Sequence, residues 1–146
     1  MIKIRNIHKT FGENTILRGI DLDVGKGQVV VILGPSGSGK TTFLRCLNAL
    51  EMPEQGRIEF DNAQPLSIDF SKKPSKHDIL ALRRKSGMVF QQYNLFPHKT
   101  ALENVMEGPV AVQGKPVAQA REEAVKLLKK VGLGDKIDLY PYQLSG

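Results

Sequence analysis

The residues best suited to chemistry lie in one short segment near the start of the chain. Glycines, hydroxyl side chains and a lysine follow one another there in the order Gly34-Pro35-Ser36-Gly37-Ser38-Gly39-Lys40-Thr41, with Thr42 next. Two glycines at this interval ahead of Lys and a hydroxyl residue form the P-loop pattern, in which backbone N–H groups and a helix start face phosphate oxygens. Lys40 can then bridge the outer phosphates, and the Thr41 hydroxyl can bind Mg²⁺. The segment predicts a site for a nucleoside triphosphate with Mg²⁺.

The flanking residues predict the elements that must position this loop. Val29–Leu33 is an apolar run without a polar face, which is typical of a strand buried on both sides in a parallel sheet. The segment Lys40–Leu50 carries apolar side chains at helical spacing, at Phe43, Leu44, Leu47 and Leu50. The order of buried strand, glycine loop and helix indicates the beginning of an α/β unit.

Further elements are expected before and after this unit. Alternating apolar residues predict half-buried strands near Ile2–Ile7 and Ile20–Val24. Residues 61–77 contain prolines and little periodicity, so they are predicted to form a surface loop ahead of a short helix over 78–85. Met88–Phe90 is predicted to be another short buried strand.

The rest of the sequence is predicted to be helical. Thr100 and Glu103 form a capping-box pattern for a helix that runs to about Glu107. Pro116 is tolerated in the first turn of a second helix, and Gly132 provides its stop. The apolar stripe of this second helix consists of Ala120, Ala124, Leu127, Leu128 and Val131.

Composition and charge exclude several classes of protein. The chain has 146 residues, 40% of them hydrophobic, which suits one compact domain or part of a larger one. The net charge is +6 and is dispersed: residues 1–73 contain 10 basic and 8 acidic side chains, and residues 74–146 contain 11 basic and 7 acidic side chains. A dispersed charge disfavours a nucleic-acid partner. No apolar run approaches the roughly 20 residues needed to span a bilayer. A single cysteine, Cys46, cannot form an internal disulfide, so we expect a soluble protein of a reducing compartment.

Several separate segments resemble, in order, the ATP-binding subunit of an ABC transporter. The segments that carry this resemblance, which extends over the whole chain, are Gly34–Arg45, Met88–Gln91 and Leu144–Gly146. A narrower similarity to the ATPases of bacterial importers for polar amino acids is carried by Cys46–Glu51, Gln91–His98 and Leu102–Val105. The resemblance implies an α/β fold of the P-loop NTPase class, with a RecA-like core, an N-terminal antiparallel β part and a helical subdomain.

The resemblance assigns roles to residues outside the loop. In this family an aromatic residue upstream of the P-loop stacks on adenine, and Phe11 occupies the matching position. Gln91 matches the Q-loop glutamine, which approaches Mg²⁺ and the attacking water, so Gln91 and Lys40 are the candidate catalytic residues. Ser145 lies in the opening of the signature motif, which faces the γ-phosphate of ATP held by the other subunit of a dimer. His98 is expected to be an ordinary loop residue.

An organisation of the chain is also implied. Residues 1–90 are expected to form the nucleotide-binding core, and residues 91–146 the Q-loop and the incomplete start of the helical subdomain. In this family the magnesium-binding aspartate comes directly after four apolar residues. In this sequence no run of four apolar residues is followed by Asp. We therefore expect the truncated, N-terminal part of a longer chain, with ATP hydrolysis near background from these residues alone.

The implied cofactors are ATP and Mg²⁺, and the implied partners are those of an importer. They are a second ATP-binding subunit in a homodimer, membrane permease subunits and, indirectly, an extracytoplasmic amino-acid-binding protein, at the cytoplasmic face of the inner membrane. Tyr93, Leu95 and Phe96 are apolar residues in a loop, and we expect them to line a groove for a short cytoplasmic helix of the permease. Internal packing against the helix that starts near Thr100 is the alternative for Phe96.

Two other function classes stay open at this point. Another P-loop enzyme, a GTPase or small-molecule kinase, would use the same loop, but no Asn or Thr here is followed by Lys as the guanine-reading motif requires. A soluble ABC-type protein acting on nucleic acid is disfavoured by the dispersed charge and by the importer-like segment after Gln91. The dinucleotide-binding pattern fails because Thr42 stands where its third glycine belongs.

Overall fold

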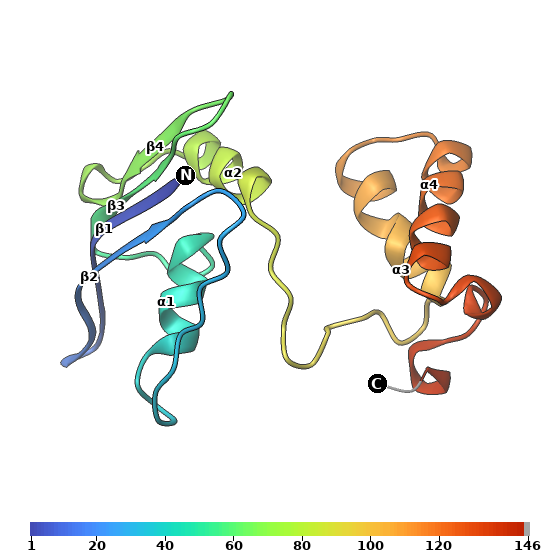
Figure 1. Ribbon diagram of the computed structural model, residues 1–146, viewed down its shortest axis with the longest axis horizontal. Coiled ribbons are helices and arrows are strands. Elements are labelled where there is room, and N and C mark those ends of the chain that lie inside the picture. Colours follow the sequence, from blue (N-terminus) through green and yellow to red (C-terminus); the bar gives the residue numbers. More distant parts are fainter. Residues whose placement is uncertain (145–146) are drawn as a thin grey trace. The chain divides into compact units, whose positions relative to one another are not determined.

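The computed structural model describes residues 1–144, which form two compact units that divide between Met88 and Val89 (Figure 1). The first unit contains β1 (Ile2–Phe11), β2 (Asn14–Val24), α1 (Lys40–Leu47), β3 (Gln55–Phe60), β4 (Leu66–Asp69), a 3-10 turn (Phe70–Lys72) and α2 (Lys76–Lys85). The second contains α3 (Ala101–Glu107), a π-helical turn (Gly108–Val112), α4 (Val117–Lys130) and two 3-10 turns (Gly134–Lys136 and Pro141–Gln143). The first unit is therefore mixed α/β, and the described part of the second is helical.

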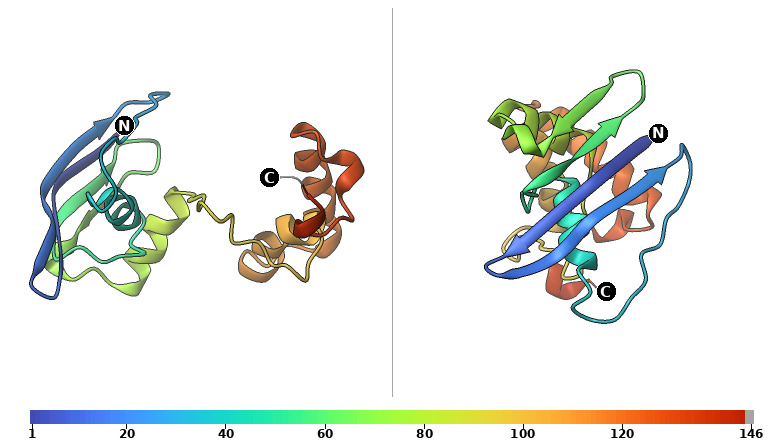
Figure 2. Two further views of the ribbon diagram at one scale, coloured as in Figure 1. Left: turned by 90° about the horizontal axis from the view of Figure 1, so that it is seen from below. Right: turned by 90° about the vertical axis from the view of Figure 1, so that its left-hand side faces the viewer.

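An antiparallel sheet in the order β2-β1-β3-β4 forms the base of the first unit. Helices α1 and α2 lie on the same face of this sheet (Figure 2). The opposite face carries ion pairs, including Arg5 with Asp23 at 2.7 Å and Arg57 with Asp69 at 3.2 Å. The core between sheet and helices consists of Ile4, Ile7, Leu17, Phe43, Cys46, Ala49, Ile58, Phe60, Ile68, Phe70 and Leu82.

Helix α1 is held within this unit by a buried side chain and by hydrogen bonds from α2. The Cys46 side chain is fully buried, and burial raises the pKa of its thiol to about 11, so it contributes packing and not reactivity. The guanidinium of Arg83, on α2, donates to the carbonyl oxygens of Ala49 at 2.8 Å and Asn48 at 3.4 Å. These carbonyls follow the C-terminus of α1, where a cation is favoured by the helix dipole.

A bulge in β1 brings the central strands unusually close. Pairing of β1 with both neighbours shifts around Asn6, whose φ is +53°. On the facing strand, Gly56 has a φ of +116°, and a Cβ there would lie 2.6 Å from the Asn6 carbonyl oxygen and 2.8 Å from that of Arg5. The bulge lets Ile4 and Ile7, three residues apart, both enter the core, and it requires glycine on the partner strand.

The second unit has its own small core and a well-capped helix. The Thr100 hydroxyl accepts from the Glu103 N–H at 3.3 Å, and the Glu103 carboxylate accepts from the Thr100 N–H at 2.8 Å. Hydrogen bonds to the Glu103 carboxylate, from the Thr100 backbone first and the Thr100 side chain second, hold its pKa below the usual value. The buried side chains between α3 and α4 are Ala101, Leu102, Ala124 and Leu128.

Two segments that were predicted as buried strands are not strands, so these two predictions are wrong. Val29–Leu33 is without strand partners, with Val29 86% and Leu33 85% exposed. Met88–Phe90 likewise pairs with no strand, and Val89 is 86% exposed. A strand buried on both faces needs hydrogen-bonded parallel neighbours. The sheet found within residues 1–144 is antiparallel and contains neither segment.

The other predicted elements are confirmed with shifted ends. The N-terminal strands form β1 and β2, the helix after the loop ends at Leu47 instead of Leu50, and α2 begins at Lys76. The expected loop over residues 61–77 contains β4, because β3 offers this short segment an antiparallel partner. Pro116 precedes α4 as its cap, and Gly132 follows α4 with a φ of +77°.

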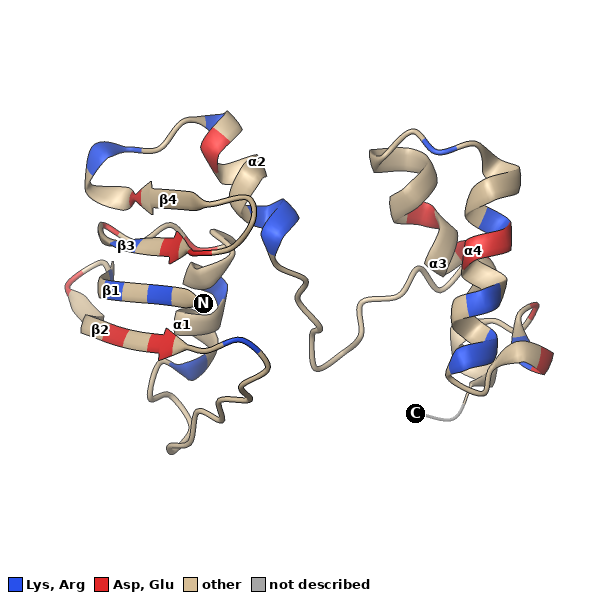
Figure 3. Ribbon diagram, turned by 45° about the horizontal axis from the view of Figure 1, so that its top comes forward, with Lys and Arg blue, Asp and Glu red and all other residues tan. Residues whose placement is uncertain are grey.

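Charge and hydropathy add two observations. Basic and acidic side chains are scattered over both units (Figure 3). None of the helices formed by residues 1–144 is long and apolar enough to cross a membrane.

Replacing Gly56 with Ala is expected to lower the free energy of unfolding by about 1–3 kcal/mol, because the added Cβ would press on β1 backbone atoms in a strained conformation. Urea denaturation followed by circular dichroism measures this loss. Gly87→Ala is the matched control, since an added Cβ there meets nothing within 4 Å. Equal stability of the wild type and Gly56→Ala would contradict the proposed close approach of β3 to the bulge.

Candidate functional site

The glycine loop runs over residues 34–39 and leads directly into α1. The Ser38 N–H donates to the Pro35 carbonyl at 3.3 Å, and the first helical hydrogen bond joins the Phe43 N–H to the Gly39 carbonyl at 2.8 Å. The N–H groups of the three helical residues before Phe43 therefore have no intrahelical partner. Together with the positive end of the helix dipole, these N–H groups favour a bound anion.

Gly39 determines how the helix start meets the sheet. It has a φ of +89°, and a Cβ on it would lie 2.9 Å from Ile16 Cγ2 and 3.2 Å from Leu17 Cδ2 of β2. A side chain at this position is thus opposed both by the left-handed backbone and by contact with β2. The N-terminus of α1 consequently lies directly against β2.

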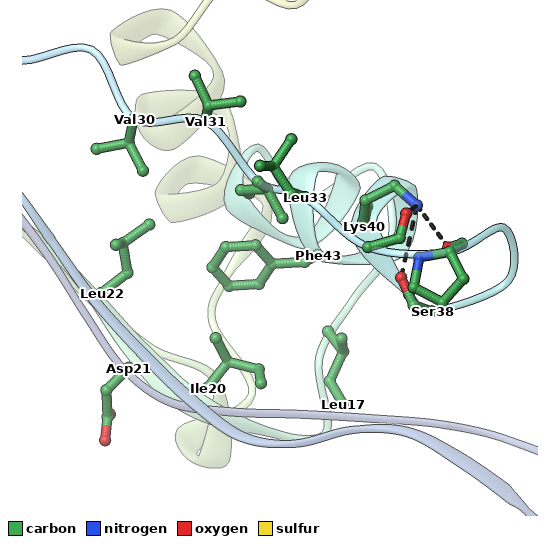
Figure 4. A pocket seen from close by; sticks show the side chains of 14 residues that line it. Leu17, Ile20, Asp21, Leu22, Val30, Val31, Leu33, Ser38, Lys40 and Phe43 are labelled. Atoms are coloured by element: carbon green, nitrogen blue, oxygen red, sulfur yellow. Dashed lines mark hydrogen bonds between the residues drawn. The ribbon is translucent and has the colours of Figure 1, made fainter.

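Lys40 folds back over the loop that precedes it. Its Nζ donates to the carbonyl oxygens of Gly34 at 2.9 Å and Pro35 at 2.7 Å, and it lies 3.5 Å from the Ser38 hydroxyl (Figure 4). An ammonium group has three donors, so these contacts use its full capacity. Binding of a phosphate by Lys40 would replace at least one of them with a stronger, charge-assisted bond.

A pocket of about 260 Å³ joins the loop to the end of β1. Phe11 and Ile16 line one side of it, and the residues from Ser36 to Thr42 line the other. The Phe11 ring is 44% exposed. Phe11 and Lys40 are about 30 residues apart in the sequence. The structure brings Phe11 together with Lys40 and the other loop residues that the sequence singled out. Whether these residues contact a nucleotide stays a prediction.

The pocket fits a phosphate chain better than it fits a metal ion alone. Nowhere in residues 1–144 do three His, Cys, Asp or Glu side chains gather as a metal site. The side-chain oxygens at the start of α1 in this pocket are the hydroxyls of Thr41 and Thr42. Mg²⁺ commonly binds in this way, with few protein ligands and with oxygens from the substrate phosphates.

A larger groove of about 470 Å³ lies between β2 and residues 29–33 (Figure 4). Its lining is mostly apolar and includes Leu22 and Phe43, with Lys40 near one end. Its acidic residue, Asp21, accepts the Asn6 N–H at 2.7 Å. The Asp21 side chain points away from the groove (Figure 4). Because the side chains that do point into the groove are apolar, the smaller pocket beside Phe11 suits a phosphate chain better.

Lys9, which the sequence analysis did not single out, lies beside Phe11. Its Nζ lies 4.8 Å from the centre of the Phe11 ring. The predicted strand ended near Ile7, whereas β1 continues to Phe11 and carries both residues, two positions apart.

Two predicted site residues, Gln91 and Ser145, do not belong to the first unit. Gln91 is exposed in the second unit, ahead of a turn in which Tyr93 and Asn94 have φ values of +56° and +52°. Its predicted role beside Mg²⁺ stays a prediction. Ser145 lies outside the described residues. His98 packs edge-on against Phe96, with ring centres 6.0 Å apart.

Asn104, on α3, fastens the residues from Phe96 to Thr100. Its side-chain oxygen accepts from the Phe96 N–H at 2.8 Å. Its side-chain nitrogen donates to the carbonyl oxygens of Phe96 at 3.1 Å, Lys99 at 3.0 Å and Thr100 at 2.9 Å. The segment is thus held to α3 while Tyr93 and Leu95 stay exposed.

A family model, curated relatives and solved structures all match this chain over most or all of its length. The family model described as ABC transporter matches residues 17–146. Over its whole length the chain is 64% identical to the L-cystine import ATP-binding protein TcyC of Bacillus subtilis and 66% identical to a probable amino-acid ABC transporter ATP-binding protein of Haemophilus influenzae. It spans 58% and 56% of these two relatives, a little over half of their length.

A solved structure is similar as well. It is the dimeric, post-hydrolysis ATP-binding cassette MJ0796 bound to ADP and phosphate, with a TM-score of 0.77 and 33% identity. The alignment covers 99% of this chain and 63% of the cassette.

Proposed function

The chain belongs to the ABC transporter family, and we propose that it binds ATP with Mg²⁺ at the loop Gly34–Thr42, as part of an ATP-hydrolysing subunit that drives amino-acid import. The family match and the likeness to a solved cassette confirm the expected α/β fold of the P-loop class. The observation that best supports ATP binding is that one pocket is lined both by the exposed aromatic residue Phe11 and by the Lys40 loop.

Each part of the site suits one part of the nucleotide. The free N–H groups at the start of α1 and the Lys40 ammonium bind the phosphate chain, and the Phe11 ring stacks on adenine. The Thr41 hydroxyl ligates Mg²⁺, which neutralises phosphate charge during transfer to water. Gln91 orients the attacking water, and Ser145 of one subunit binds the nucleotide of the other in the proposed homodimer.

The substrate class that we propose is a polar amino acid. One relative is named for L-cystine import and another for an unspecified amino acid. The family assignment and these names favour an importer over a GTPase, a small-molecule kinase or a nucleic-acid-binding ABC protein. Selection of the amino acid itself would belong to the permease and the extracytoplasmic binding protein, which are the proposed partners beyond the dimer.

The proposed contact with the permease uses Tyr93 and Leu95 at the cytoplasmic face of the inner membrane. Both side chains are exposed, 64% for Tyr93 and 46% for Leu95. Asn104 holds the backbone of Phe96, the residue after Leu95, on α3. An apolar surface of this kind suits the apolar face of a short helix. Phe96 is also partly exposed, although its ring packs against His98 and Lys99.

Lys40→Ala is expected to weaken ATP binding at least tenfold, since a charge-assisted hydrogen bond worth about 1.5–3 kcal/mol is lost. Titration calorimetry measures the dissociation constants. Lys26→Ala, which removes the same charge from an exposed position outside the pocket, should bind ATP as the wild type does. Equal affinities of the wild type and Lys40→Ala would contradict the assignment of the phosphate site.

Thr41→Ala is expected to weaken ATP binding in the presence of Mg²⁺ and to have little effect in EDTA, because the hydroxyl acts through the metal ion. Thr41→Ser keeps the hydroxyl and should retain the Mg²⁺ dependence of the wild type. An identical loss of affinity with and without Mg²⁺ would show that the hydroxyl is not a metal ligand.

Tyr93→Glu and Leu95→Glu, made in the full-length protein, are expected to abolish co-purification with the permease and to leave ATP binding unchanged. A buried interface cannot accommodate an unpaired carboxylate without a large desolvation cost. Tyr142→Glu is the control, because Tyr142 is an exposed tyrosine of the same unit outside the loop. Normal assembly and transport after both loop substitutions would exclude this docking surface.

A further inference from the structure

Lys9 is held beside the Phe11 ring by two acceptors from another part of the chain. Its side chain is only 12% exposed. Its Nζ donates to the Met52 carbonyl at 2.8 Å and lies 3.4 Å from a carboxylate oxygen of Glu54. The same nitrogen is 4.8 Å from the centre of the Phe11 ring, within the range of a cation–π interaction.

The acceptors are themselves fixed to the strand that carries Lys9. The second carboxylate oxygen of Glu54 accepts from the Thr10 N–H at 2.9 Å, and the Glu54 N–H donates to the His8 carbonyl at 3.1 Å. Glu54 therefore spans the residues on both sides of Lys9. Unlike a solvated surface lysine, Lys9 is restrained in one position relative to the ring.

We propose that Lys9 is a positioning residue for the nucleotide base, and that it acts through Phe11. A planar ring has two faces, and the ammonium occupies the approach to one of them, which leaves the other for a base. The positive charge attracts the ring's electron density and makes the opposite face less negative, which reduces its repulsion of a stacked purine. The ammonium also restricts rotation of an otherwise exposed ring, so less conformational entropy is lost when the base binds. This inference rests on the proposed function, in which Phe11 stacks on adenine.

A purely structural lysine would behave differently. If Lys9 only tied Met52 and Glu54 to β1, its removal would disturb the pocket for every ligand. If it acted only as a positive charge near the phosphates, its removal would weaken polyphosphate and nucleotide alike. An action through the ring predicts instead an effect that depends on the base and on Phe11.

The test compares ATP with inorganic triphosphate, which lacks the base, by titration calorimetry with Mg²⁺ on the full-length protein. Lys9→Met keeps the aliphatic stem and is expected to weaken ATP about two- to fivefold, in line with a single cation–π contact, and to leave triphosphate unchanged. Lys9→Arg retains a cation that stacks on aromatic rings and should restore ATP affinity. Lys3→Met, on the same strand but without a contact to the ring, is the matched charge control.

The decisive comparison is made in a Phe11→Leu background. There Lys9→Met is expected to have no further effect on ATP, because the ring through which it acts is gone. Unchanged ATP affinity in Lys9→Met, an equal loss for ATP and triphosphate, or a full effect in the Phe11→Leu background would each overturn the inference.

If the proposed function itself is wrong, the binding measurements give a different result. Phe11→Leu alone would then leave ATP affinity unchanged, or neither ATP nor triphosphate would bind to the wild type. A Phe11→Leu variant that loses ATP affinity, combined with a Lys9→Met variant that does not, would retain the proposed function and reject only the role of Lys9.

Discussion

The candidate site depends on one close contact, the packing of Gly39 against β2. With no room for a Cβ between Gly39 and Ile16, the loop enters α1 in a single arrangement, so the free N–H groups and Lys40 are fixed relative to that strand. The strands β1 and β2 form one hairpin, and Phe11 pairs with Asn14 near its turn. The part of the site suited to phosphate and the part suited to a base are therefore joined through the same two strands.

The two units divide the proposed work between them. The first carries the loop and Phe11, and it is stabilised by burial of apolar side chains between the antiparallel sheet and its two helices. The second has a separate core, and Asn104 there holds the backbone of Phe96 to α3. We propose that the first unit binds the phosphate chain and the base, and that the second unit contributes Gln91 and Ser145 to the nucleotide and contacts the permease.

Short-range patterns in the sequence predicted the loop, the helix after it and the capping box at Thr100, because each signal lies within a few residues of the structure that it specifies. The buried strand predicted for Val29–Leu33 was wrong, since an apolar run indicates burial but does not identify its neighbours. The strand β3 was not predicted, because it depends on pairing with a bulge some 50 residues earlier. Lys9 was missed for a similar reason, as its position is set by Met52 and the residues that follow.

The central claim is that the loop at the start of α1 binds the phosphate chain while Phe11 binds the base. Nuclear magnetic resonance spectra of the labelled protein, recorded with Mg-ATP and separately with adenosine, test it most directly. We predict that Mg-ATP shifts the backbone N–H resonances of residues 37–42 and the ring protons of Phe11, whereas adenosine shifts only the Phe11 ring. Loop resonances that stay unmoved by Mg-ATP, while binding is saturated, would contradict the account.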